Sequence, residues 1–195
     1  MKPKIILVAG YPAAGKSTFS RELSKRLNIP CFNKDVIKEV MADGFGKENE
    51  ELINRDKKGS STTFMLMLHI AEQFLKTGHV CILESNFQKH YPTPLTESKQ
   101  IENLLERYNC ECLTFLFKGD LDVVSERYYN RERHWTHGRA LDKDSIKNYC
   151  IHTRLGEFGI GETVTVDTTR FEDVDYDELF DYAQKFIGGD SYKFR

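Results

Sequence analysis

The stretch Gly10-Tyr-Pro-Ala-Ala-Gly15-Lys16-Ser17 decides how the rest of this sequence is interpreted. It fits the pattern G-x-x-x-x-G-K-[ST] at every fixed position, and it lies between a short apolar run, Lys4–Ala9, and an amphipathic stretch that begins at Lys16. A glycine loop of this kind turns its backbone N–H groups inward around phosphates, and the following helix adds the attraction of its N-terminus. The pattern and its context therefore predict a site for a nucleoside triphosphate.

Each residue type in the loop has an expected part in holding the nucleotide. Lys16 should reach the β- and γ-phosphates, and the hydroxyl of Ser17 should bind Mg²⁺. The loop residues expected to hold ATP or GTP are Gly10, Ala13, Ala14, Gly15, Lys16, Ser17 and Thr18. The alternative, a surface glycine turn beside an exposed lysine, does not account for a match at every fixed position.

Length, charge and cysteine content describe one ordinary globular domain. The 195 residues include 28 basic and 30 acidic side chains and give a formal net charge of -2, so no overall positive field attracts nucleic acid or a membrane surface. Five cysteines without an export signal favour reduced thiols. Cys110 and Cys112 fall on one face of an expected strand, which favours packing over metal binding. We expect one cytoplasmic domain, residues 1–195, without a membrane segment.

Apolar runs alternate with stretches of helical periodicity along the chain. The expected strands are Lys4–Ala9, Ile29–Phe32, His79–Leu83, Cys110–Phe117 and Thr163–Val166. The expected helices are Lys16–Leu27, one from an Asp35 cap to about Met41, one from Ser60 or Ser61 to Gly78, one from Thr93 and Pro94 to Tyr108, an arginine-rich one from Asp120, and Asp175–Ile187. Residues 43–58 are charged and weakly periodic, and we expect a mobile insertion there. The alternation predicts an α/β fold with a parallel sheet covered on both faces.

Polar residues follow three of these strands. Asp35 comes after the second strand, Glu84 and Asn86 after the third, and Asp120 after the fourth. The carboxyl ends of parallel strands meet at one crevice, where carboxylates can accept a proton from a hydroxyl or order Mg²⁺ through water. We interpret Asp35 and Glu84 as functional and Asp120 as a helix cap. A cap is also the alternative for Asp35.

The segment from Arg127 to Arg139 holds four arginines, and we expect residues 127–140 to form a lid. Arg127 and Arg131 stand at i and i+4 and would share a helical face. Arginines on a closing flap neutralise charge on a transferring phosphoryl group, which makes these two better candidates than Arg133. The alternative is a set of ordinary salt bridges on a solvated helix.

Four stretches together resemble the small P-loop kinases that include polynucleotide 5′-kinase, chloramphenicol phosphotransferase and the zeta toxins. They are YPAAGKSTFSREL, CFNKDVIKEV, VCILESNF and SERYYNR, and the resemblance extends from Lys4 to about Thr169. It implies the P-loop NTPase fold, a five-stranded parallel sheet with a lid. It also implies ATP-dependent transfer of the γ-phosphate to a hydroxyl, with Mg²⁺ as cofactor.

The resemblance implies roles for individual residues. Asp35 matches the general base that acts on the acceptor hydroxyl, and Glu84 matches an acidic position near the metal or the acceptor, where several members have aspartate. Asn86 stands at the spacing of the group's acid-x-Asn turn, and Arg127 and Arg131 match lid arginines. The expected catalytic set is Lys16, Asp35, Arg127 and Arg131; the substrate set is Asp35, Glu84 and Asn86; the metal set is Ser17 and Glu84; and Thr168 and Thr169 border the base of the nucleotide.

The sequence therefore favours a Mg²⁺/ATP-dependent kinase that acts on a small-molecule hydroxyl. A polynucleotide 5′-hydroxyl kinase is less favoured, because single-strand grooves usually combine basic tracks with exposed aromatic side chains. A nucleotide-sugar kinase like the zeta toxins is a further alternative. A slowly hydrolysing nucleotide-binding switch belongs to another class, and Asp35 argues against it because a switch needs no base for an acceptor hydroxyl.

Overall fold

The computed structural model describes residues 2–51, 58–89, 96–137 and 142–188. Within these residues, five parallel strands form one sheet in the order β2-β3-β1-β4-β5. The strands are β1 (Lys4–Gly10), β2 (Cys31–Asn33), β3 (Cys81–Glu84), β4 (Glu111–Lys118) and β5 (Glu162–Asp167). This sheet confirms the predicted α/β fold with five parallel strands.

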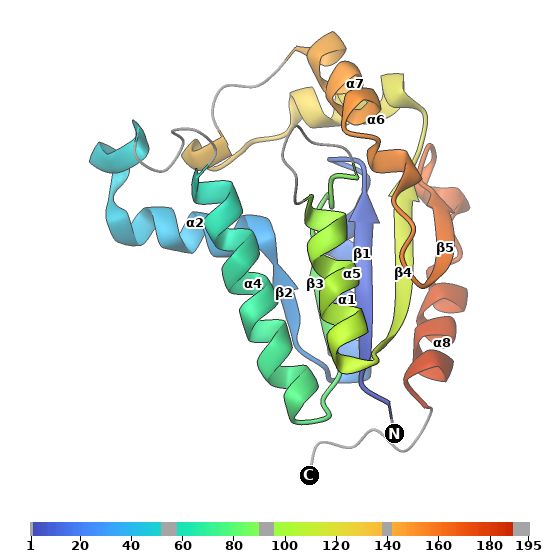
Figure 1. Cartoon of the computed structure of the whole chain (residues 1–195). Helices are drawn as coiled ribbons and strands as arrows, with labels where there is room; N and C mark the ends of the chain where they lie inside the picture. The colour runs from blue at the N-terminus through green and yellow to red at the C-terminus, as the bar shows by residue number, and fades with distance from the viewer. Residues whose placement is uncertain (1, 52–57, 90–95, 138–141, 189–195) are drawn as a thin grey trace.

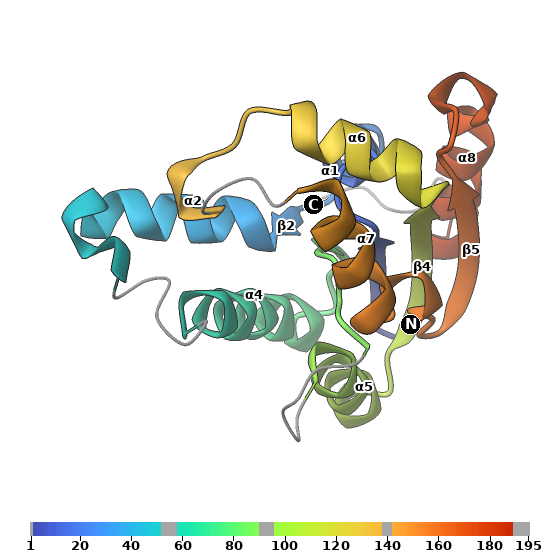
Figure 2. The same cartoon turned by 90° about the horizontal axis from the view of Figure 1, so that it is seen from above.

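Helices cover both faces of the sheet (Figures 1 and 2). The helices α1 (Lys16–Leu27) and α8 (Tyr176–Ile187) pack on one face, and α4 (Lys58–Lys76) and α5 (Glu97–Tyr108) pack on the other. Alternate residues of β1 supply the two cores: Ile5 and Leu7 face α4 and α5, whereas Ile6 and Val8 face α1 and α8. This two-sided burial explains why the run is apolar at every position.

In the described part of the chain, three further helices lie at the carboxyl ends of the strands or beside them (Figure 1). They are α2 (Lys34–Phe45), α6 (Leu121–Asn130) and α7 (Lys143–His152). Short 3-10 turns occur at η1 (Lys47–Asn49), η3 (Trp135–His137), η4 (Leu155–Glu157) and η5 (Phe171–Asp173). The sequence reasoning missed α7, although Asp142 caps it and Ile146 and Cys150 give it a buried face at i and i+4 spacing.

A third, smaller apolar cluster joins α6 and α7 above the sheet. Its buried members are Ile146, Cys150 and Leu155, with Tyr11, Leu121, Tyr128 and Tyr149 packed against them. Tyr11 also packs against the core on the α1 side of the sheet. The phosphate-binding loop therefore connects the main core to this upper cluster.

The turn of the chain at the end of β1 requires glycine at position 10. Gly10 has φ +116°, and a Cβ atom placed on it would lie 1.9 Å from the carbonyl oxygen of Phe117 in β4. The same carbonyl accepts a hydrogen bond of 2.8 Å from the amide of Tyr11. Gly15, with φ +87°, stands at the start of α1. The chain can thus turn closely over β4 before the helix begins.

The second helix begins differently from the prediction. Asn33, not Asp35, is the cap of α2: its side-chain oxygen accepts from the amides of Asp35 and Val36 at 2.8 and 3.0 Å. The expected cap at Asp35 is therefore wrong, because the residue two positions earlier already satisfies these amides. The helix also passes Met41 and ends at Phe45, so the first part of the expected insertion is helical. Residues 52–57 lie outside the described residues, and mobility in this segment stays a prediction.

Other boundaries shift as well. Helix α4 begins at Lys58, before the caps expected at Ser60 or Ser61. Helix α5 follows a Thr96 cap, whereas the expected start at residues 93 and 94 lies outside the described residues. The cap expected at Asp120 is confirmed, since its side chain accepts hydrogen bonds from the first turn of α6. The last helix begins at Tyr176, one residue after the expected start, and Asp175 caps it.

The arginine-rich helix is shorter than expected. It ends at Asn130, and Arg131 has an extended backbone with φ -87° and ψ 143°. The expected helical pairing of Arg127 with Arg131 is therefore wrong. The chain beyond Asn130 lacks the regular apolar stripe that would bury a further helical turn.

None of the helices in the described part of the chain combines the length and apolar character needed to cross a bilayer.

We predict that Gly10→Ala lowers the free energy of unfolding by about 3 kcal/mol or more, because the methyl group meets the Phe117 carbonyl and φ is positive. The matched control is Gly44→Ala, where no atom lies within 4 Å of the added methyl group. In helix α2 that change should be neutral or stabilising by about 0.5–1 kcal/mol. Urea unfolding measures both values, and equal stability of the two variants would contradict this account.

Candidate active site

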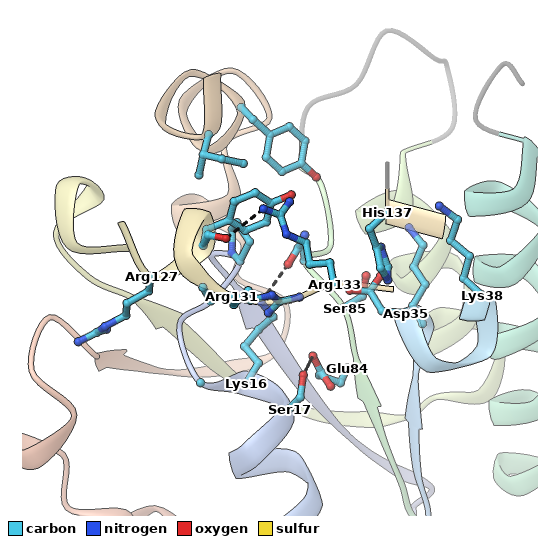
Figure 3. Close-up of a pocket in the computed structure, with 18 of the residues that line it drawn as sticks. Lys16, Ser17, Asp35, Lys38, Glu84, Ser85, Arg127, Arg131, Arg133 and His137 are labelled. Atoms are coloured by element: carbon cyan, nitrogen blue, oxygen red, sulfur yellow. Dashed lines mark hydrogen bonds between the residues drawn. The ribbon is translucent and has the colours of Figure 1, made fainter. Parts of the chain in front are cut away.

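A cavity of about 520 Å³ opens at the carboxyl ends of the strands (Figure 3). Most of its wall comes from the loop before α1 and the first turn of α1, the first turns of α2, the end of β3 with the segment after it, and the chain from the end of α6 to η3. Of the loop residues expected to hold the nucleotide, Ala13, Gly15, Lys16, Ser17 and Thr18 line this cavity. The structure thus brings elements distant in sequence to one side of the sheet.

Lys16 is not the exposed loop lysine that a simple glycine turn would carry. It is only 6% exposed, and its ammonium donates to the carbonyls of Gly10 and Tyr11 at 3.2 and 2.6 Å and to Asn86 Oδ1 at 2.9 Å. Burial lowers the pKa of Lys16, and the carboxylates of Glu84 and Asp35 oppose this effect. Asn86, expected at the substrate, here positions the lysine.

Glu84 is the buried carboxylate of the site, with 5% exposure. It accepts hydrogen bonds from Ser17 Oγ at 3.1 Å, from Ser20 Oγ at 3.4 Å and from Asn33 Nδ2. Burial raises the pKa of Glu84, whereas the nearby Lys16 ammonium lowers it. Three donors and one cation therefore offset the cost of burying this carboxylate.

Ser17 and Glu84 form a donor set that suits Mg²⁺. Both supply hard oxygen ligands, and their oxygens already lie 3.1 Å apart at the mouth of the loop. Among the described residues, no group of three or more His, Cys, Asp or Glu side chains could hold a metal ion. A phosphate-bound Mg²⁺ does not require one, because phosphate oxygens and water complete its coordination.

Asp35 lies in the first turn of α2 and lines the cavity. Its side chain is exposed, and its carboxylate makes no hydrogen bond or ion pair with any residue that the structure describes. Since Asn33 caps the helix, the carboxylate is left to face the cavity. Asp35 is also near enough to Lys16 and Glu84 to influence the pKa of both.

The two arginines expected in the lid lie in different parts of the site. Figure 3 shows Arg131 above Lys16, and its positive charge contributes to lowering the pKa of that lysine. Arg127 points away from this group: it donates to the carbonyls of Thr168 and Thr169 at 2.5 and 2.9 Å. Its guanidinium also stacks on the ring of Phe171 at 3.9 Å. Arg127 therefore lies with the loop expected to border the base, not with the phosphate site.

Four expected nucleotide contacts are not part of the described cavity wall: Gly10, Ala14, Thr168 and Thr169. Gly10 packs on Phe117, and Ala14 is fully buried. The hydroxyl of Thr168 donates to the carbonyl of Lys118 at 3.2 Å, and that of Thr169 donates to Asp167 at 2.6 Å. Both threonines thus shape the loop after β5.

Turn η3 of the expected lid is fastened to helix α2. Two histidines contact carboxylates, His137 with Glu39 at 2.8 Å and His134 with Asp43 at 3.0 Å. Two further contacts join the same segments: Trp135 Nε1 to Asp43 at 3.2 Å, and Lys38 Nζ to the carbonyl of Thr136 at 2.7 Å. The lid thereby rests on the helix that carries Asp35. Residues 138–140 of the expected lid lie outside the described residues.

Sequence reasoning missed several residues of this site. Asn33 directly follows a strand and precedes a helix, which is a strong cap signal that the neighbouring Asp35 obscured. Lys38 stands three residues after Asp35 and so shares its helical face, which the spacing would have shown. Ser20 and Phe171 gave no local signal, because only the fold brings them to Glu84 and Gly15.

A profile of the AAA domain family matches residues 5–149. The chain belongs to this AAA domain family. The matched region includes the phosphate-binding loop, Asp35, Glu84 and both lid arginines that the sequence singled out.

Individual relatives of this AAA domain protein are named as kinases. A solved structure of a putative kinase from Chloroflexus aurantiacus is 27% identical, with a TM-score of 0.75, and the match covers 95% of this chain and 96% of that one. A 2-phosphoglycerate kinase from Methanococcus vannielii is 28% identical over 132 residues, which are 66% of this chain and 40% of that protein. An L-seryl-tRNA(Sec) kinase from Methanococcus maripaludis is 25% identical over 90% of this chain and 62% of its own length. The chain thus spans less than two thirds of either curated relative.

We predict that Lys16→Met weakens ATP binding about 10- to 100-fold, because a charge-assisted contact to the phosphates is lost. Methionine keeps an apolar stem in the buried position, so the protein should still fold. Calorimetry gives the affinity and a thermal melt gives the control. An unchanged ATP affinity in a folded variant would remove Lys16 from the nucleotide site.

A second prediction separates the two arginines. Arg127→Ala should lower the Tm by about 3–6 °C, because it removes two hydrogen bonds and a ring contact. Arg131→Ala should leave the Tm nearly unchanged and lower kcat at least about 100-fold, since this guanidinium has no hydrogen bond or ion pair among the described residues. Melting curves and turnover of both variants test this. A lower Tm for Arg131→Ala together with a lower kcat for Arg127→Ala would contradict this assignment.

Proposed function

We propose that this protein is a Mg²⁺/ATP-dependent kinase that transfers the γ-phosphate to a hydroxyl of a small-molecule acceptor. The observation that carries the proposal is the position of Asp35. Its carboxylate faces the same cavity as Lys16 and Ser17, and it is relieved of helix capping by Asn33. A nucleotide-binding switch has no use for a carboxylate in this place, whereas a kinase needs a proton acceptor there.

The chain's own residues supply most of the parts that phosphoryl transfer requires. The N-terminus of α1 and Lys16 bind the β- and γ-phosphates, and Arg131 covers them from the lid. Ser17 and Glu84 would hold Mg²⁺, which neutralises phosphate charge when bound. The acceptor oxygen forms a bond to the γ-phosphorus as the bond to the β-phosphate oxygen breaks, the hydroxyl proton passes to Asp35, and ADP leaves.

We propose that the base of the nucleotide binds beside Arg127 and Phe171, which both line the cavity. The ring of Phe171 lies between Arg127 and Gly15, with 2.9 Å between its Cε1 atom and a Cβ placed on Gly15. A flat cationic group over an aromatic ring is suited to stack with a purine. We therefore assign the contacts with the base to Phe171 and Arg127. Thr168 and Thr169 support these contacts, because their carbonyls accept hydrogen bonds from Arg127. ATP and GTP both remain compatible with a stacking contact.

The small-molecule acceptor is favoured over a polynucleotide by the shape of the site. The cavity of about 520 Å³ must hold both the triphosphate and the acceptor, and η3 rests on α2 above it. The two curated relatives are named 2-phosphoglycerate kinase and L-seryl-tRNA(Sec) kinase, so the acceptors in their names differ. Within the small P-loop kinases, we place the chain near polynucleotide 5′-kinase, chloramphenicol phosphotransferase and the zeta toxins, and we expect it to act in the cytoplasm.

We predict that Asp35→Asn lowers the transfer rate about 10²- to 10⁴-fold while ATP affinity hardly changes, because the base is lost and the shape is kept. The control Asp181→Asn removes an exposed carboxylate on α8, outside the cavity wall. Transfer is followed as ADP formation with a panel of hydroxyl compounds and a 5′-hydroxyl oligonucleotide. Full activity of Asp35→Asn would leave the reaction without a base and favour the switch.

A further inference from the structure

The cavity has two ends with different charged groups. At the loop end are Lys16, Ser17 and Glu84, and Figure 3 shows Lys38 and His137 on the opposite side, with Asp35 near them. We call the part of the wall formed by Lys34, Lys38, Glu97, Arg133 and His137 the acceptor end. Since a triphosphate on the loop would place its γ-phosphate toward Asp35, the acceptor must bind at this end.

Basic residues exceed acidic ones along the described wall of the cavity. Six lysines and arginines line it but only three carboxylates, although the whole chain has 28 basic and 30 acidic residues. At the acceptor end, the buried pair Lys34 and Glu97 is neutral as a unit. Lys38, Arg133 and the base Asp35 supply further charged groups to the same part of the wall.

Arg133 is incompletely satisfied. Its guanidinium stacks on the ring of Tyr128 at 3.8 Å, and Nη2 donates to the carbonyl of Tyr128 at 3.1 Å. Its Nη1 atom is buried without a hydrogen-bond partner in the described part of the chain. A buried charged donor without an acceptor is unfavourable. Arg133 lines the cavity, so a rotation of its guanidinium away from the ring would let Nη1 donate to an oxygen of a ligand.

Lys38 faces the same space from helix α2. It stands three residues after Asp35, on the same helical face, and its ammonium donates to the carbonyl of Thr136 in η3. Burial lowers the pKa of Lys38, and the carboxylate of Asp35 opposes this effect. A further negative charge nearby would stabilise the ammonium in the same way.

We propose that the acceptor carries an anionic group, a carboxylate or a phosphate, in addition to its hydroxyl, and that Lys38 and Arg133 bind this group. The proposal rests on the kinase function above and specifies its substrate class. The planar fork of an arginine matches either anion, and a lysine adds a point charge. Binding the anion at these two residues would place the hydroxyl of the same molecule beside Asp35.

The first test measures anion binding with the nucleotide site already filled. Inorganic phosphate, glycerate and neutral glycerol are titrated by calorimetry into the protein saturated with Mg²⁺ and a non-hydrolysable ATP analogue. Phosphate or glycerate should bind saturably and glycerol should not. Lys38→Met and Arg133→Met should each weaken anion binding about tenfold or more. Lys99→Met changes an exposed side chain of α5 outside the cavity wall and should not weaken anion binding.

Absence of saturable anion binding, or an equal loss in Lys99→Met, would overturn the proposal. ATP affinity of each variant serves as the check on folding. Arg133→Lys provides a further comparison, because it keeps the charge and removes the planar fork; partial recovery relative to Arg133→Met is expected.

The second test compares turnover within matched sets of acceptors. The sets are glycerol, glycerate and glycerol 3-phosphate, and glucose, gluconate and glucose 6-phosphate. In any set whose members are phosphorylated, kcat/KM for an anionic member should exceed that for the neutral member by about 100-fold. Whether the preferred member carries a carboxylate or a phosphate shows which anion the site binds. Preference for the neutral member would contradict the proposal. Anion binding as expected with no transfer to any acceptor would instead count against the kinase function.

Discussion

The buried carboxylate of Glu84 is the interaction on which the arrangement of the site depends. A carboxylate at this depth is unfavourable unless several donors meet it, and the donors come from different elements. Ser17 and Ser20 approach from α1, and Asn33 approaches from the junction of β2 and α2. One side chain at the end of β3 therefore fixes the starts of two helices relative to each other.

Asn33 extends this dependence to the proposed chemistry. Its amide nitrogen donates to Glu84, and its oxygen caps α2 through the amides of Asp35 and Val36. The orientation of the first turn of α2 is thus set by the same carboxylate that contacts Ser17. Asp35 is placed opposite the phosphate-binding loop as a result, without using its own side chain to hold the helix.

The sheet and the phosphate-binding loop could be predicted from sequence because both depend on local signals. Continuous apolar runs mark buried parallel strands, and Gly10, Gly15 and Lys16 satisfy a pattern with few alternatives. The errors arise where two local signals compete or where the decisive contact is distant. Asp35 and Asn33 are both good caps, and α6 ends before Arg131 without a glycine or proline nearby to mark its end. The separation of Arg127 from Arg131 depends on the loop after β5, which lies 41 residues beyond Arg127 in the chain.

The helices α6 and α7 cover one side of the cavity, and a small apolar cluster joins them. This cluster stabilises the two helices separately from the cores beside the sheet. Among the described residues it has three buried members, whereas each core beside the sheet has sixteen, so it excludes much less apolar surface from water. The free energy needed to open a region locally is lower where less apolar surface is buried. Amide hydrogens of α6 and α7 should therefore exchange with solvent sooner than those of β1 and β4, through openings that leave the sheet folded. The cover of the cavity can then open and close many times within the lifetime of one folded molecule.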